Sequence, residues 1–352
     1  MHTSRKLTHA LLALVALVVL ASAALAQNIG PGVLPGTNAM VSDQKAGSVL
    51  FYLYYQSSTS AGTNTRINIT NTNPSVSAFV HVFFQAGCVP ADAFICLTPS
   101  QTMSFTTLDY DPDSTGYIVA VAADGGTATV AGTGCPINFN WLIGDEFLRI
   151  AGGFTANLGA EAVAARFVTA NNLINTCGAA SATATLNFDG GATATSYDQL
   201  GGVLAVDNFP SLLDNNTIRL IVQSPRGNFS VGNTNTTSLF GILYDEAEQP
   251  FSFVFTVTCG NPLLTFSGAN PGVPRIVGGG LNSVVGIGRT GWMRFWDTGS
   301  IGNAGLQAGI LGAVLINNSA AGTNSFSGGH TLHKLTLVGT NTIVIPIFVP
   351  AC

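Results

Sequence analysis

The sequence predicts an all-β protein of two tandem β-sandwiches, and three observations support this fold class. Apolar and polar residues alternate with period 2 in many short segments, as along a strand with one buried face. Clusters of Gly, Asn, Asp and Ser separate these segments, which is the composition of turns. Several short motifs recur in the same order in the second half of the chain. Many short strands with almost no helix are typical of sandwiches and barrels.

The alternation predicts individual strands, and a single helical pattern divides them. Strands are expected at Arg66 to Thr70, Ile137 to Ile143, Thr183 to Phe188, Thr217 to Val222, Phe251 to Thr258 and Trp292 to Trp296. Gly159 to Asn172, rich in Ala, predicts one short helix. The expected organisation is therefore a first sandwich (27–156), a linker with the helix (157–180) and a second sandwich (181–352).

The internal repeat joins motifs that keep their order while their spacing drifts. The matched pairs are Asp43 to Leu50 with Asp198 to Leu204, Asn64 to Ile67 with Asn216 to Arg219, Phe79 to Cys88 with Phe251 to Cys259, and Thr115 to Tyr117 with Thr290 to Trp292. Chance agreement among turn residues is the alternative explanation. If the repeat is real, the two halves have the same strand order.

Three segments also carry a resemblance to a known group. The segments Asp43 to Leu50, Thr65 to Asn73 and Gly329 to Leu335 resemble those of secreted bacterial proteins of unassigned function. The resemblance would extend over most of the mature chain, and it implies export and an immunoglobulin-like β architecture. Because that group has no agreed activity, the resemblance implies no catalytic residues.

The N-terminus has the pattern of a secretory signal peptide (1–26). Arg5 and Lys6 precede an apolar run from Leu11 to Leu20, and Ala24 to Ala26 form an A-x-A cleavage site. A membrane anchor is the alternative, which the short apolar run and the small residues at its end disfavour. No later stretch reaches the roughly 18 apolar residues that span a bilayer. The expected location is therefore extracellular or at the cell surface, with no transmembrane segment after signal cleavage.

The charge of the mature chain excludes one class of partner. Without Arg5 and Lys6 it has 10 basic and 17 acidic residues, a net charge of 10 − 17 = −7, and its lysines are Lys45 and Lys334. A nucleic-acid binder needs clustered Lys and Arg to neutralise phosphates. No nucleic-acid partner is expected.

Six cysteines in an exported chain predict disulfides rather than a zinc site, since no C-x2-C pair occurs. Six cysteines allow 15 pairings. The expected pairs are Cys88–Cys96, Cys135–Cys177 and Cys259–Cys352, the last of which would fix the C-terminus.

The residues needed for common catalytic sites are scarce. Only His81, His330 and His333 remain after signal removal, and no G-x-S-x-G segment occurs. A spacing of three places His330 and His333 on opposite faces of a strand, which disfavours a shared metal. Gly286 to Gly291 fits G-x-G-x-x-G, but an expected strand follows it where a dinucleotide site needs a helix.

Asp109, Asp111 and Asp113 form the one candidate metal site. Alternate carboxylates in a loop can converge on calcium, which binds six to eight oxygens. Pro112 interrupts the run and no Glu occupies the twelfth position, so a solvated acidic turn is the alternative. No cofactor is expected unless calcium binds here.

The segment after Gly291 supplies the candidate binding residues. Period 2 places Trp292, Arg294 and Trp296 on one strand face, with Met293 and Phe295 on the other, toward the core. Trp and Arg are enriched in binding hot spots. Coverage of this face by the other sandwich or a loop is the alternative.

These observations favour an exported, non-enzymatic component of a surface, matrix or filament, whose partners are other copies or envelope and extracellular components. An extracellular binding module or adhesin that recognises saccharide or a protein is the alternative function. A carboxylate-based glycosidase comes third, because the separation that such carboxylates need cannot be taken from sequence.

Overall fold

The computed structural model describes residues 40–60, 62–126, 132–166, 177, 181–232, 236–258, 262–267, 270–275, 280–298, 308–320, 326–337 and 341–350. The expected signal peptide (1–26) lies outside these residues. Within them the regular structure is β-strand, apart from three single-turn 3-10 segments. The prediction of an all-β protein is confirmed.

The strands of the described residues form five sheets. The first has the order β4 (Val89–Leu97), β3 (Ala78–Ala86), β6 (Thr115–Ala123), β1 (Val49–Gln56), β9 (Glu161–Val163). The second has β5 (Thr102–Thr106), β2 (Asn64–Asn71), β7 (Leu142–Ile150), β8 (Phe154–Gly159). The third has β15 (Pro250–Thr258), β14 (Thr236–Tyr244), β17 (Thr290–Asp297), β11 (Gly201–Pro210), β20 (His333–Leu337). The fourth has β16 (Leu263–Thr265), β12 (Asn216–Gln223), β18 (Leu311–Asn318), β19 (Phe326–Thr331). The fifth has β10 (Thr183–Phe188), β21 (Asn341–Pro346), β13 (Gly227–Asn228).

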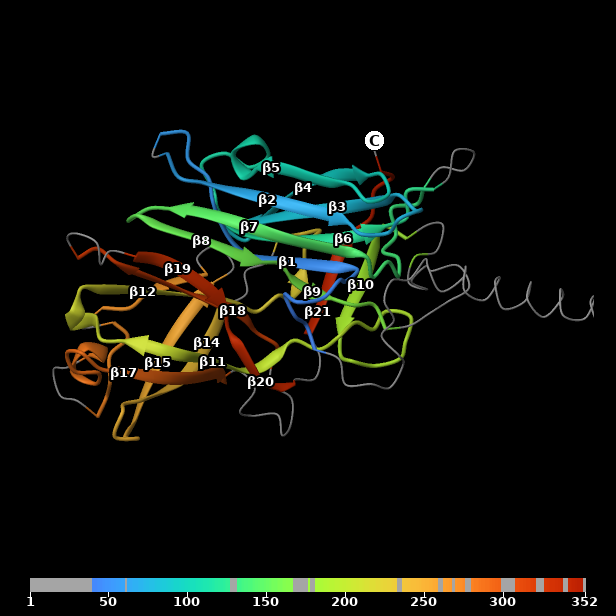
Figure 1. Ribbon diagram of the computed structural model, residues 1–352. Helices are drawn as coiled ribbons and strands as arrows, with labels where there is room; N and C mark the ends of the chain where they lie inside the picture. Colours follow the sequence, from blue (N-terminus) through green and yellow to red (C-terminus); the bar gives the residue numbers. More distant parts are fainter. Residues whose placement is uncertain are drawn as a thin grey trace, which may run out of the picture.

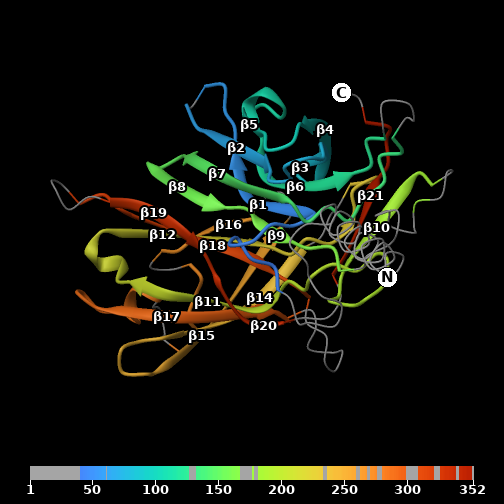
Figure 2. The same cartoon turned by 45° about the vertical axis from the view of Figure 1, so that its right-hand side comes forward.

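The predicted pair of tandem immunoglobulin-like β-sandwiches is wrong. The five small sheets instead have a five-bladed, propeller-like arrangement. In Figure 1 the sheet of β2 and β7 lies at the top, that of β11 and β17 at the bottom, and β10 and β21 at the right; Figure 2 shows the same elements turned by 45°. The error has a physical cause: alternation reports that one face of a strand is buried, and sandwiches and propellers share that pattern.

The largest hydrophobic cluster shows that the halves are not independent sandwiches. It includes Val49 of β1, Leu148 of β7, Leu186 of β10 and Ala313 of β18, which belong to four different sheets. Two smaller clusters lie between the first and second sheets and between the third and fourth. Because the shared cluster removes apolar surface of both halves from water, neither half completes its core alone.

The motif repeat does correspond to a repeated strand order. The first sheet (β4-β3-β6-β1-β9) and the third (β15-β14-β17-β11-β20) have equivalent orders, as do the second and fourth. The matches of β2 with β12 and of β6 with β17 fall on equivalent strands. The match of Phe79 to Cys88 with Phe251 to Cys259 is wrong, because β3 corresponds to β14 rather than β15.

Several strand predictions are confirmed, and two elements are corrected. Strands β2, β10, β12, β15 and β17 cover the predicted segments. The predicted helix at Gly159 to Asn172 is wrong, because Glu161–Val163 is strand β9; residues 167–172 lie outside the described part. The predicted strand at Ile137 to Ile143 is also wrong, since regular pairing begins only at Leu142.

The predicted disulfide pairing is wrong for both pairs that the described residues test. Cys96 lies opposite Phe79, whereas Cys88 lies in the turn beyond the last β3–β4 pair, so about 25 Å of strand separates them. A disulfide joins Cα atoms about 4.4–6.8 Å apart, which excludes a Cys88–Cys96 bond. Cys135 and Cys177 are free thiols, with burial the main cause that raises the pKa of Cys177. Cys259 and Cys352 lie outside the described residues.

A fully buried carboxyl group lies beside the shared cluster. Oε1 of Glu146, on β7, accepts a hydrogen bond from the backbone N–H of Leu53 at 3.2 Å, and Oε2 has no partner among the described residues. Burial raises the pKa of Glu146 well above the usual carboxyl value of 4.5. The folded protein therefore keeps a proton here at a pH where the unfolded chain has lost it.

This proton makes stability depend on pH. We expect the free energy of unfolding to fall as the pH rises from about 4.5 through the folded-state pKa, because the folded state binds more protons there. Glu146→Gln should flatten that decline, measured as melting temperature at pH 5 and pH 8. Glu246→Gln, at an exposed carboxyl, serves as the control. A Glu146→Gln variant with the wild-type pH slope would contradict the expectation.

Candidate functional site

The predicted binding residues lie on strand β17 with the alternation expected. Met293 and Phe295 are fully buried in the core, whereas Trp292 is 39% exposed and Arg294 and Trp296 are partly exposed. The candidate face is therefore on the outer side of the third sheet, and the described residues leave Trp292 accessible.

Two residues of the neighbouring strand complete this face. Register pairs Tyr244 of β14 with Trp292 and Phe240 with Trp296. The rings of Tyr244 and Trp292 stack with centroids 4.7 Å apart and planes 9° from parallel, and those of Phe240 and Trp296 are 5.2 Å apart. Together with Arg294 they form the aromatic strip. Sequence reasoning missed Phe240 and Tyr244, because cross-strand register is not visible in one strand.

Arg294 contacts a tyrosine of the strip. Its Nη2 donates to the Tyr244 hydroxyl at 3.0 Å, and its Cζ lies 5.8 Å from the centre of the Tyr244 ring. A cation–π contact at such a site contributes about 0.5–1 kcal/mol. Both contacts hold the guanidinium against Tyr244, so the strip is presented in one fixed arrangement.

Each of the three aspartates proposed for calcium accepts hydrogen bonds from its own set of donors. Asp109 accepts from the Thr106 hydroxyl at 2.7 Å, Asp111 accepts from the hydroxyls of Tyr55 and Ser114, and Asp113 accepts from Thr59. No group of three or more His, Cys, Asp or Glu side chains within the described ranges is arranged to hold a metal ion. The loop geometry accounts for these carboxylates as turn acceptors.

The histidines are placed differently from expectation. Nε2 of His330 and Nε2 of His333 lie 3.5 and 3.4 Å from the two carboxylate oxygens of Asp207, so the prediction of opposite faces is wrong. The chain passes from β19 to β20 at buried Leu332, and these strands belong to different sheets. Burial alone would raise the pKa of Asp207, but the hydrogen bond from His333 and the charge of His330 lower it below the usual value.

His81 is a packing residue of the first sheet. Its ring lies between those of Phe83 and Phe94, at 4.0 and 4.3 Å, and its Nε2 is 2.9 Å from Asp92. Burial is the main cause that lowers the pKa of His81. These contacts explain this residue without a catalytic role.

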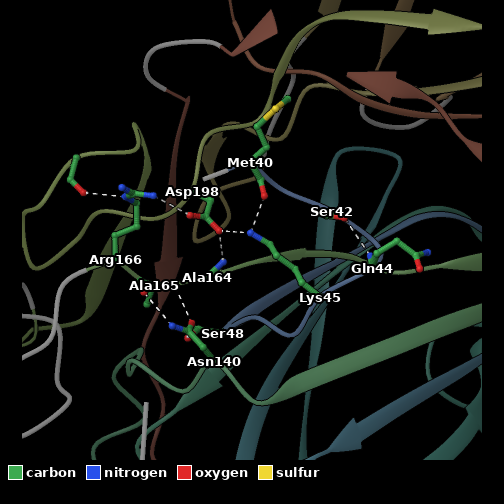
Figure 3. Close-up of polar contacts among 11 residues, drawn as sticks. Met40, Ser42, Gln44, Lys45, Ser48, Asn140, Ala164, Ala165, Arg166 and Asp198 are labelled. Carbon is green, nitrogen blue, oxygen red and sulfur yellow. Dashed lines mark hydrogen bonds and ion pairs between the residues drawn. The ribbon is translucent and has the colours of Figure 1, made fainter. Parts of the chain in front are cut away.

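A buried charge cluster connects the two halves of the chain (Figure 3). Asp198 has a fully buried side chain, and its carboxylate accepts from Lys45 Nζ, from Arg166 Nη1 at 3.1 Å and from the backbone N–H of Ala164 at 2.9 Å. Lys45 also donates to the Met40 carbonyl at 2.6 Å. Full pairing of this kind is what allows a carboxylate to be buried in ionised form.

In a second ion pair between the halves, the lysine comes from the second half and the carboxylate from the first. Lys334 Nζ of β20 lies 2.6 Å from Oε1 of Glu161 on β9, whose side chain is fully buried. Burial raises the pKa of Glu161, and the Lys334 ammonium opposes that shift. Both lysines outside the expected signal peptide thus pair with a buried carboxylate of the other half.

Comparisons with known proteins give little guidance. No family model matches the chain, and no curated protein matches it. Among solved structures, the PBSX exported protein XepA is similar with a TM-score of 0.19 and 9% identity over 74% of this chain and 85% of that one. A glycosyl hydrolase family 2 member from Bacteroides cellulosilyticus DSM 14838 has a TM-score of 0.15 and 9% identity, over 89% of this chain and 30% of that one. Likenesses at this level carry no argument about function.

In the described part of the chain, no helix is both long and apolar enough to cross a membrane.

Proposed function

We propose that the protein is an exported, non-enzymatic component of a surface, matrix or filament, and that it acts through contact with other copies of itself or with envelope components. The signal-like N-terminus supports export. The aromatic strip supports a contact function, because it holds large amphipathic rings on the outer face of a sheet whose inner face is already core.

The composition of the strip is the observation that carries this proposal. Two Trp, one Tyr and one Arg lie together on adjacent strands, and these residue types dominate the energetics of protein contacts. Stacking between Trp292 and Tyr244 fixes both rings before any partner binds, so little side-chain entropy is lost on contact. Trp292 keeps 39% of its surface exposed, and burial of that surface would stabilise an assembly.

Trp292→Ala and Trp296→Ala should prevent assembly while leaving the melting temperature nearly unchanged. Sedimentation velocity and negative-stain electron microscopy of the purified protein would show ordered polymers for wild type and monomers for the variants. Phe147→Ala removes an aromatic ring that is 46% exposed on a different sheet, and this control should assemble normally. Monomeric wild type at all concentrations would contradict self-assembly, and variants that unfold would contradict the role of the strip as a contact surface.

A binding module or adhesin is the second candidate, and the Arg294–Tyr244 contact favours it. An arginine held against a ring beside an exposed indole offers stacking and hydrogen bonding in one place, as a saccharide or a protein loop requires. Glycan-array binding by monomeric wild type, lost in Trp292→Ala, would support this function over assembly.

A further inference from the structure

A pocket lies at the turn between β7 and β8, away from the aromatic strip. It has a volume of about 230 Å³, and Thr63, Arg149, Gly152, Gly153 and Phe154 are among the residues that line it. The turn depends on Gly152 and Gly153, whose φ angles of 86° and 80° lie in the left-handed region. The volume is below that of a drug-sized site and suits one small group.

Thr63 lines the pocket and has an unpartnered hydroxyl among the described residues. Thr63 is only 6% exposed, and its Oγ1 has no hydrogen-bond partner among the described residues. A buried hydroxyl without a partner is costly, and such groups in folded proteins are commonly satisfied by a ligand or water. Because Oγ1 itself is covered, a ligand in the pocket is expected to meet the charged groups beside it and not this hydroxyl.

Two arginines near this hydroxyl have no carboxylate partner among the described residues. Arg149 lines the pocket, and neither it nor Arg219 forms an ion pair with a described acidic residue. Nη1 of Arg219 donates to the Ala151 carbonyl at 2.6 Å, and the guanidinium lies 4.2 Å from the centre of the Phe154 ring. Nη2 of Arg219 lies against Gly152, 2.9 Å from where a Cβ would be.

This placement is unusual for a chain with 17 acidic residues and 12 basic ones. Two guanidinium groups without carboxylates create a local positive potential, and arginine suits planar or tetrahedral oxyanions because its donors are fixed in a fork. Arg219 is held by the Ala151 carbonyl and the Phe154 ring, so its charge is already positioned.

We propose that this pocket binds a small oxyanion, a carboxylate or sulfate group such as an acidic saccharide carries. Arg149 supplies the charge that lines the pocket, and Arg219 supplies a fixed positive potential beside it. The pocket is separate from the aromatic strip, so anion binding is expected whether or not the protein assembles.

Calorimetric titration of the purified protein at constant ionic strength tests the proposal with D-glucuronate, sodium sulfate and uncharged D-glucose. We expect binding of glucuronate or sulfate and none of glucose; which anion binds more tightly tells the carboxylate source from the sulfate source. Arg149→Ala should weaken anion binding about tenfold or more. Arg66→Ala, an exposed arginine of the same sheet outside the pocket, should bind as wild type.

Thr63→Val gives a second control, one that keeps the charges of the pocket and is safe for folding. Because Oγ1 is covered and has no partner among the described residues, its removal should leave the melting temperature unchanged or raise it, and anion affinity should stay as in wild type. Absence of anion binding at about 10 mM, a concentration at which even weak sites of about 4 kcal/mol are occupied, would overturn the proposal. Equal binding of glucose, or unchanged affinity in Arg149→Ala, would also overturn it. Loss of assembly in the Trp292 variant would leave all of these results unaffected.

Discussion

Asp198→Asn is expected to destabilise the protein by about 3–5 kcal/mol, the range for breaking a buried ion pair by removing one partner. The change removes the negative charge that faces Lys45 and Arg166, and the Arg166 side chain is only 1% exposed. A buried guanidinium in the junction of the two halves then loses its carboxylate. At about 2–4 °C per kcal/mol for a chain of this size class, the melting temperature should fall by roughly 6–20 °C.

A double-mutant cycle separates this effect from a general loss of packing. Lys45→Met should also destabilise, and the Lys45→Met/Asp198→Asn pair should cost less than the sum of the single changes, because the two side chains share one interaction. Glu246→Gln is the control: its exposed pair with Arg289, at 3.9 Å, should contribute less than about 1 kcal/mol. Additive single changes, or a melting temperature within about 2 °C of wild type for Asp198→Asn, would show that the cluster does not join the halves.

Gly116→Ala is expected to cost about 2–3 kcal/mol, because the strand it belongs to passes too close to β3 for a side chain. A Cβ at Gly116 would lie 2.0 Å from the Gln85 carbonyl oxygen, a backbone atom that cannot move aside alone. Gly291, the equivalent residue in the repeat, would place its Cβ 2.5 Å from the Tyr244 carbonyl oxygen. The recurring Thr-Gly-aromatic motif therefore has a steric reason.

Thermal unfolding of Gly116→Ala and Gly291→Ala, beside Gly328→Ala, measures this effect. Gly328 also lies in a strand, but a Cβ there would meet nothing within 4 Å, so its replacement should change stability by less than about 0.5 kcal/mol. Equal melting temperatures for the three variants would remove close backbone approach as the cause.

Sequence predicted the local geometry of strands well. Phe253, Phe255 and Val257 are buried on β15 as their alternation indicated, and Met293 and Phe295 are core while Trp292 faces outward. These successes have one basis: alternation depends only on which side of a single strand is buried.

The failures concern relations that no single segment contains. The strand predicted at Ile137 to Ile143 would place Asn138 and Asn140 on the face opposite its apolar residues, yet both are nearly fully buried. Asn140 Oδ1 accepts from the Ser48 hydroxyl at 2.6 Å and from the Ala165 N–H at 2.8 Å, so distant segments satisfy it. The grouping of sheets, the aromatic partners on β14 and the convergence of two histidines on Asp207 likewise depend on pairing across the chain.

The two lysine pairs also join parts of the chain that are synthesised far apart in time. Lys45 and Asp198 are 153 residues apart, and Lys334 and Glu161 are 173 apart. A chain made from its N-terminus exposes Glu161 long before Lys334 exists, so an early half leaves a carboxylate without its counter-ion. Contacts of such long range form slowly and late. The first half therefore gains the counter-ion of one of its buried carboxylates only when the last strands of the chain have been made.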